Sequence, residues 1–324
     1  MLRTLLATAT VTAGLLAVPG AAFAADTTTQ LTAAQMTAAL KAVAGVTGTT
    51  AAKGWAGSFT LTGEQGSGTG TFVTDPVGGR AYTRVDVPFQ HETSYAVATK
   101  GVYASLATAE EKAAVTMMRK PSVKFVFTPQ ATLNITSWAK YNSADPATVL
   151  IDDPEHAGTK VEHADSSVTY RYGDGDEGDF TFEVSPAAVL TSAKIDYANA
   201  LTATYTWRYG SQSVTLPTAA QTVSSATMAK GLAYLNLGAD VRKLARKSAA
   251  DVRVAANKHT VRVSVLRKVV KRDVAKFNKA AQVKVVTVAN ITGGVRISAR
   301  NPWTGVKVAY TIKASGKKVV VTKK

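Results

Sequence analysis

The chain has 324 residues, no cysteine and a formal net charge of +16 at pH 7. The lack of cysteine excludes thiol catalysis, disulfides, cysteine metal sites and the thioether lipid anchor of bacterial lipoproteins. The length allows one large domain or two ordinary domains, each with its own hydrophobic core.

The first 24 residues have the pattern of a secretory signal peptide. Arg3 gives a charged start, and the run from Thr4 to Val18 is apolar but too short to span a bilayer. Ala22-Phe23-Ala24 places small residues where signal peptidase reads the chain. We therefore expect cleavage after Ala24 and a protein secreted to the extracytoplasmic cell envelope, without a membrane span and without a lipid anchor.

Charge is divided unevenly along the chain. Residues 224–324 carry 23 Lys and Arg against three acids, whereas the preceding 223 residues carry 15 bases and 19 acids. Such a step predicts a domain boundary and two different partners. We place a first domain at 25–220, a linker at 221–230, where the residues are small and polar, and a basic α+β domain at 231–324.

The first domain begins with a predicted helix over 31–46, where apolar residues recur near helical spacing. From Trp55 the hydrophobic period changes to two, and short strands follow one another between Gly- or Pro-bearing turns. A helix that starts at Thr108, with Glu111 completing a capping box, interrupts them, and one or two short helices precede strands that end with 213–217. The pattern predicts a strongly curved antiparallel sheet of about 10–11 strands with a helical lid.

The basic domain is predicted to contain helix over 225–252, a strand over 259–265, and an amphipathic helix over 266–280. Four strands in which Val alternates with Lys or Arg follow, between 282 and 323. The predicted fold class is therefore α+β, with a small basic α+β domain after the larger one.

Aromatic residues recur at spacing two in several predicted strands, so that each set projects from one face of the sheet. One interpretation is a plain core in which the rings pack on each other. The other is an apolar concavity that holds an apolar ligand, and alternation alone does not separate the two. The candidate cavity residues are Phe59, Leu61, Phe125, Phe127, Tyr170, Tyr172, Phe180, Phe182, Tyr205 and Trp207.

The order of an N-terminal helix, a long antiparallel meander and a helical insertion is followed by Tyr209-Gly210 and then Val214-Thr215-Leu216-Pro217. Over residues 28–220 this arrangement resembles the LolA-like half-barrel proteins, especially the LppX/LprG/LprA group of actinobacterial envelope lipoproteins. The resemblance implies an unclosed barrel with helices as a lid over a hydrophobic cavity, for lipid binding and lipid transport without chemistry. The chain departs from that group in the missing lipobox cysteine and the added basic domain.

Two acidic segments invite a metal or catalytic interpretation. Residues 152–165 collect carboxylates around His156 and His163, and residues 172–180 contain Asp174 and Asp176 near Gly178. Neither segment has the fixed spacing of a zinc site or an EF-hand, and solvated hairpins account for both. The chain also lacks a nucleophile elbow and a phosphate-binding loop. We expect no enzyme, no cofactor and no metal, and keep a hydrolase at 152–165 as a minor alternative.

The basic domain offers a surface for anions. Export removes nucleic acid as a normal partner and leaves anionic wall polymers or the membrane surface. Charge that serves solubility alone is the alternative, although a net charge of roughly 2–8 is ample for that. The predicted anion-binding residues are Lys268, Lys271, Arg272, Lys276 and Lys279.

These observations lead to one hypothesis and one alternative. The hypothesis is an exported, monomeric, non-catalytic carrier that binds an acylated lipid or glycolipid and docks to an anionic cell wall or membrane surface through its basic domain. The alternative is a cell-wall-associated structural or adhesion protein without a ligand cavity.

Overall fold

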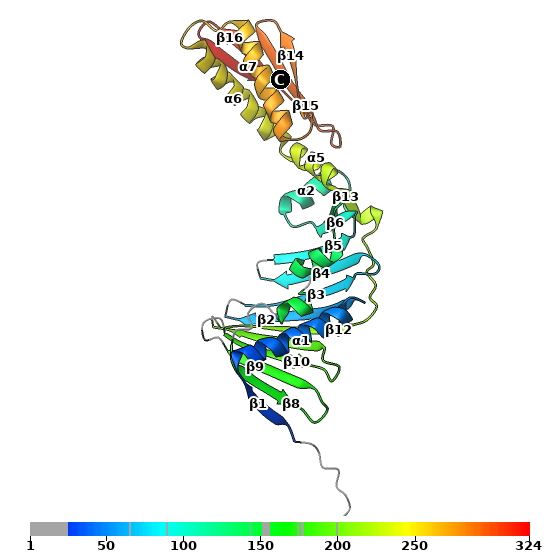
Figure 1. Cartoon of the computed structure of the whole chain (residues 1–324). Coiled ribbons are helices and arrows are strands. Elements are labelled where there is room, and N and C mark those ends of the chain that lie inside the picture. The colour runs from blue at the N-terminus through cyan, green and yellow to red at the C-terminus, as the bar shows by residue number, and fades with distance from the viewer. Residues whose placement is uncertain are drawn as a thin grey trace, which may run out of the picture.

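The protein has an α+β fold with a large sheet and a separate small one (Figure 1). The large sheet has thirteen strands and the small sheet has four. The predicted signal peptide at 1–24 lies outside the described residues. The computed structural model describes residues 25–64, 66–88, 90–142, 144–150, 156–173, 175, 178–198 and 200–324.

The large sheet is mostly antiparallel and runs in the order β1-β8-β9-β10-β11-β12-β2-β3-β4-β5-β6-β7-β13. Its end strands do not pair with each other, so the sheet is unclosed, as predicted. The strands are β1 (Thr27–Leu31), β2 (Trp55–Gly63), β3 (Gly66–Asp75), β4 (Arg80–Val87), β5 (Gln90–Val97), β6 (Gly101–Ser105), β7 (Phe125–Pro129), β8 (Gly158–Glu162), β9 (Val168–Gly173), β10 (Gly178–Val184), β11 (Leu190–Tyr197), β12 (Leu201–Tyr209) and β13 (Thr222–Ser224).

Both end strands were missed by the sequence pattern. β1 precedes the first helix and pairs with β8, and β13 pairs with β7 in parallel. The strand predicted at 213–217 is wrong, because residues 211–218 form no strand. A side-chain hydrogen bond contacts that stretch instead, because Arg80 Nη1 donates to the carbonyl oxygen of Val214 at 3.2 Å.

Four helices accompany the large sheet. The first, α1 (Ala33–Ala51), begins at a capping box formed by Thr32 and Gln35. The second, α2 (Ala109–Met117), begins at the predicted capping box of Thr108 and Glu111, which is confirmed. Where one or two short helices were predicted, the structure has two, α3 (Ile135–Asn142) and α4 (Pro146–Val149).

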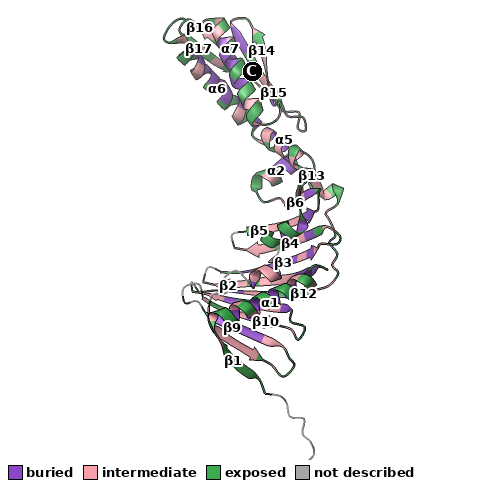
Figure 2. Ribbon diagram, viewed as in Figure 1, coloured by how far each residue is buried: buried purple, intermediate pink, exposed green. Residues whose placement is uncertain are grey.

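The helices lie on one face of the large sheet, which we call the helix-covered face. Side chains of directly paired residues lie on the same face of a sheet, so the register assigns every strand residue to one side. A continuous apolar core lies between α1 and strands β9–β12, β2 and β3 on that face, and Figure 2 shows these positions as buried. Its fully buried members include Met36, Leu40, Phe72, Phe182 and Leu190.

The second unit packs two long helices on one face of the small sheet. Its strands are β14 (Val286–Ile291), β15 (Gly294–Arg300), β16 (Lys307–Ser315) and β17 (Lys318–Lys323). Its helices are α5 (Ser225–Leu235), α6 (Leu237–Ala256) and α7 (Val263–Ala280), and α6 and α7 share one hydrophobic core with the sheet. The helix predicted over 225–252 divides at Asn236. The strand predicted over 259–265 is wrong, because α7 already begins at Val263.

The segment predicted as a linker, 221–230, carries β13 and the start of α5. Val223 and Met228 are buried against α2 in a cluster with Val115 and Met118. The contact continues into the second unit, where Asn301 Nδ2 donates to Met117 Sδ at 2.9 Å. The division into domains at 220 and 231 stays a prediction, and the segment between them is packed against both units.

Candidate functional site

Most of the predicted cavity residues do come together, on the helix-covered face. Within this group Tyr170, Tyr172, Phe182 and Trp207 are buried. The others are half-buried: Phe59, Leu61, Phe180 and Tyr205. Strand register brings them to one side, because β12 pairs with β2, and β10 pairs with both β9 and β11.

These rings pack on one another and on α1. Tyr172 stacks on Phe180 with ring centroids 4.8 Å apart, and Tyr205 stacks on Trp207 at 5.8 Å. Met36, Leu40 and Val43 of α1 belong to the same buried cluster. The space between α1 and the sheet is therefore occupied by side chains of the chain itself, so this conformation has a packed core at the predicted cavity.

Two hydrogen bonds fix the polar edges of the aromatic residues. Trp207 Nε1 donates to the carbonyl oxygen of Ala144 at 2.9 Å, and the Tyr209 hydroxyl donates to the carbonyl oxygen of Leu190 at 2.5 Å. Burial raises the pKa of the Tyr209 and Tyr205 hydroxyls, so both stay neutral near pH 7. The two hydroxyls are therefore uncharged parts of the lining, whereas Lys160 lies opposite Tyr170 in the ladder and places a charge at the edge of the same face.

Phe125 and Phe127 lie on the opposite face of the large sheet. Phe127 pairs with Tyr103 across the ladder, with ring centroids 4.7 Å apart, and Phe125 meets Tyr95 at 5.5 Å. Val126 between them turns to the helix-covered face and packs against the α2 cluster. The structure thus does not bring Phe125 and Phe127 together with the other predicted cavity residues. Spacing of two places both rings on one face, but only the strand register shows which face.

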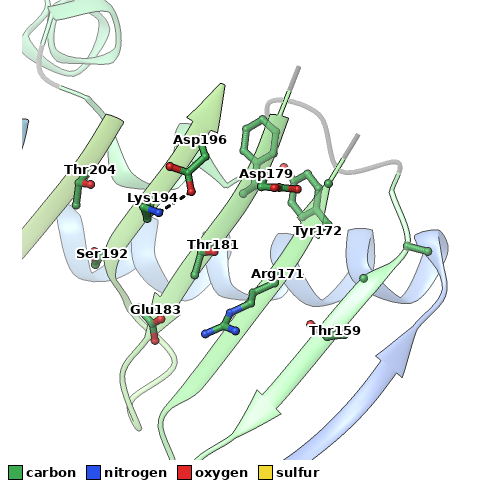
Figure 3. Close-up of a pocket in the computed structure, with 14 residues that line it drawn as sticks. Thr159, Arg171, Tyr172, Asp179, Thr181, Glu183, Ser192, Lys194, Asp196 and Thr204 are labelled. Carbon is green, nitrogen blue, oxygen red and sulfur yellow. Dashed lines mark hydrogen bonds and ion pairs between the residues drawn. The ribbon is translucent and has the colours of Figure 1, made fainter. Parts of the chain in front are cut away.

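A polar hollow of about 820 Å³ lies on that same opposite face, over strands β8–β12. Figure 3 shows its polar side chains, such as Arg171, Thr181 and Lys194, on one side of the strands and the long helix on the other. Lys194 Nζ donates to Asp196 at 2.6 Å and Thr202 also donates to Asp196, and these bonds hold the pKa of the Asp196 carboxyl below its usual range. Its polar lining includes Thr159, Arg171, Thr181, Glu183, Lys194, Asp196 and Thr204.

The hollow is unsuited to an acyl chain because its lining carries charges of both signs. The signal that would have found the hollow is the cross-strand alignment of Arg171, Thr181 and Lys194. That alignment depends on the register, which the sequence pattern did not give.

The His-rich acidic segment forms ordinary hydrogen bonds where it is described. His163 Nδ1 lies 2.9 Å from Asp26 Oδ2, and His163 Nε2 lies 2.8 Å from Thr169 Oγ1. His156 stacks on Tyr172 with ring centroids 5.8 Å apart. Within the described ranges no group of three His, Asp or Glu could hold a metal ion. Asp152, Asp153, Glu155, Asp174 and Asp176 lie outside those ranges.

The five predicted anion-binding residues all lie exposed on α7. Arg272 differs from the four lysines, because it is paired with Asp273 at 3.0 Å and with Asp251 at 3.8 Å. The acidic partners hold its guanidinium in place, although its side chain is also exposed to solvent. None of the helices in the described part of the chain is long and apolar enough to cross a membrane.

Comparison with known proteins gives likeness of structure only. No protein-family model and no curated protein matches the sequence. One similar structure is an uncharacterized conserved protein from Thermus thermophilus. The match covers 57% of this chain and 98% of the Thermus protein, at 10% sequence identity and a TM-score of 0.29. The lipoprotein LppX of Mycobacterium tuberculosis is similar to 56% of this chain over 99% of its length, at 11% identity and a TM-score of 0.30. A MucA/MucB complex structure from Pseudomonas aeruginosa is similar to 84% of this chain over 75% of its own chain, at 8% identity and a TM-score of 0.26.

Proposed function

We propose that this chain is an exported, non-catalytic carrier that binds an acylated lipid or glycolipid beneath α1 and attaches to anionic wall polymer or membrane surface through its basic unit. The observation that carries the proposal is the apolar cluster between α1 and the sheet, in which sheet aromatics contact the apolar stripe of α1. The unclosed sheet with helices over one face supports the same function.

Ligand entry requires α1 to move, because its own side chains fill the cluster. The contact between α1 and the sheet is largely apolar, and Lys41, the one charged residue of the helix, is exposed. A polar contact is made by Thr47, whose Oγ1 accepts from the backbone N–H of Leu190 at 3.0 Å. Apolar attraction is non-directional, so an acyl chain can replace Met36 and Leu40 against the rings, whereas the Thr47 bond is lost if the whole helix moves away.

A reversible tether tests this movement. A Cβ placed on Gly48 of α1 would lie 3.7 Å from Cβ of Ala147 on α4, close to the separation found in disulfides. The double variant Gly48→Cys/Ala147→Cys should form a disulfide that joins α1 to α4. Because the natural chain has no cysteine, no competing disulfide can form.

Uptake of a fluorescent fatty acid by the delipidated protein is the readout. We expect uptake by the natural chain and by the reduced double variant, and at least about a tenfold slower uptake by the oxidised variant. Equal uptake by the oxidised and reduced forms contradicts entry beneath α1. No uptake by the natural chain, together with no lipid in mass spectra of the natively purified protein, contradicts the carrier function altogether.

The second candidate is a wall-associated structural or adhesion protein without a ligand cavity. It is favoured by the packed core itself, since Phe182, Met36 and Leu40 are fully buried in this conformation. In that case the basic unit alone acts on a partner, and the large sheet serves as a rigid support.

Both candidates share attachment through the basic unit, which electrostatics would make reversible by salt. We expect binding to wall fragments or to anionic vesicles at low ionic strength, and release at about 1 M NaCl, where the screening length falls to roughly 3 Å. Binding that persists at high salt, or after deletion of residues 226–324, contradicts the attachment.

A further inference from the structure

We propose that the open face of the small sheet holds a site for a linear polymer of phosphate groups, which deepens the attachment proposed above and rests on it. The helices α6 and α7 cover one face of this sheet. The other face carries a hollow of about 450 Å³ at the end nearest α5. The cations that line it are Lys284, Arg296, Arg300 and Lys307.

The hollow arises from the sizes of the side chains along the strands. Thr287, Ser298 and Ala309 are paired across β14, β15 and β16, so a row of small side chains crosses the sheet. Arg296 and Arg300 lie on either side of this row. Each is two residues from Ser298 along β15, so all three side chains lie on the same face. The hollow therefore has small side chains at its base and long cationic side chains around its rim.

Like charges in this hollow repel each other and destabilise the folded sheet when no anion is bound. Arg300 and Lys307 are direct partners in the antiparallel ladder, and like charges placed opposite each other destabilise a sheet. Both side chains are exposed, and no described carboxylate pairs with either. An anion between them would remove the repulsion.

Carboxylates that could neutralise the hollow are placed elsewhere. The second unit has three acidic side chains, Asp240, Asp251 and Asp273, and all three lie on α6 or α7. Asp251 and Asp273 are engaged with Lys247 and Arg272. The open face of the sheet therefore carries cations without a side-chain carboxylate.

The shape of the hollow favours a chain over a flat surface or a single ion. Arg296 and Arg300 are separated by about 14 Å along the strand, at roughly 3.4 Å per residue. Successive phosphates of a linear polymer can contact both ends at once, without the two side chains converging on one anion. Arginine also forms paired hydrogen bonds with phosphate oxygens, which lysine does not. A membrane surface would meet the rim of the concavity and leave the floor at Ser298 empty.

Titration calorimetry of the full chain with short-chain inorganic polyphosphate tests this site, because it measures the affinity directly. The variant Arg296→Gln/Arg300→Gln/Lys307→Gln removes three charges from the hollow. A control with the same charge change, Arg242→Gln/Lys243→Gln/Arg246→Gln, removes three exposed charges from α6. We expect at least about a tenfold loss of affinity for the first variant and less than about threefold for the control. The slope of log K against log salt should fall by about 2 in the first variant, at about 0.7 per lost contact.

A further variant, Ser298→Phe, keeps every charge and fills the floor of the hollow, and it should lose polyphosphate binding as well. Equal losses in the two triple variants would mean that net charge alone attracts the polymer, and would overturn the site. The same variants should be tested with phosphatidylglycerol vesicles. If the substitutions in the hollow weaken vesicle binding as much as they weaken polyphosphate binding, the choice of a polymer as the ligand is overturned. If the natural chain binds neither probe at low salt, the proposed attachment itself fails.

Discussion

Replacement of Phe182 by alanine separates a packed core from an open cavity. The side chain of Phe182 is 0% exposed, and its ring centroid lies 6.0 Å from that of Tyr172. A buried phenylalanine removes roughly 150 Å² or more of surface from water, which at about 25 cal/mol per Å² corresponds to about 4 kcal/mol. Measured losses for buried Phe→Ala changes also lie at about 3–5 kcal/mol. We therefore expect Phe182→Ala to lower the free energy of unfolding by about 4 kcal/mol.

Urea unfolding followed by tryptophan fluorescence is the assay, because Trp55, Trp138 and Trp207 all belong to the large-sheet unit. The matched control is Phe127→Ala, where a half-buried ring on the opposite face should cost about 1–2 kcal/mol. A loss below about 2 kcal/mol for Phe182→Ala in the lipid-free protein would refute the packing argument, since it would mean that the ring lines a space and is not part of a filled core.

Three further predictions address local features. Thr108→Ala removes the hydroxyl that caps α2, and thermal unfolding should show a loss of about 1 kcal/mol, with no loss contradicting the cap. A Cβ on Gly57 would lie 2.1 Å from the Thr206 carbonyl oxygen, so Gly57→Ala should cost about 3 kcal/mol or more, whereas Gly238→Ala, which meets nothing within 4 Å, should gain roughly 0.5–1 kcal/mol in the same urea assay. The pKa of Asp196 is lowered first by its bond from Lys194, so its stabilising contribution is present above the unfolded pKa of about 3.9 and is lost as pH falls through the lower folded pKa. Asp196→Asn should therefore reduce stability at pH 7 and leave it unchanged near pH 2; an equal difference at both pH values would contradict this linkage.

Local patterns in the sequence predicted individual elements well. The Thr108 and Glu111 capping box gave α2, and alternation gave the strands from Trp55 onward, because both signals depend on residues close together in the chain. The strand predicted over 259–265 failed for a related reason. Its alternating valines lie in and just before the first turn of α7, where burial against the small sheet decides the structure.

Long-range pairing could not be predicted in the same way. β13 has three residues and pairs with a strand 97 residues earlier, so nothing in its own sequence indicates a strand. The same limit affected the candidate sites. Tyr205 and Phe59 are direct ladder partners on the helix-covered face, whereas Phe127 needed the register of five intervening ladders to be placed on the other face. The sheet cations Arg300 and Lys307 became a candidate site only once β15 and β16 were aligned.

The two ends of the large sheet bear on how this protein behaves at high concentration. Unpaired strand edges are templates for addition of a strand from another molecule. Here thirteen strands leave edges of only five and three residues, β1 and β13, and α5 packs beside the shorter one. The small sheet ends in β17, where Lys318 and Lys323 place charge along the edge. These three short or charged edges therefore disfavour growth of the sheets from molecule to molecule, so we expect the protein to stay free of fibrils at high concentration.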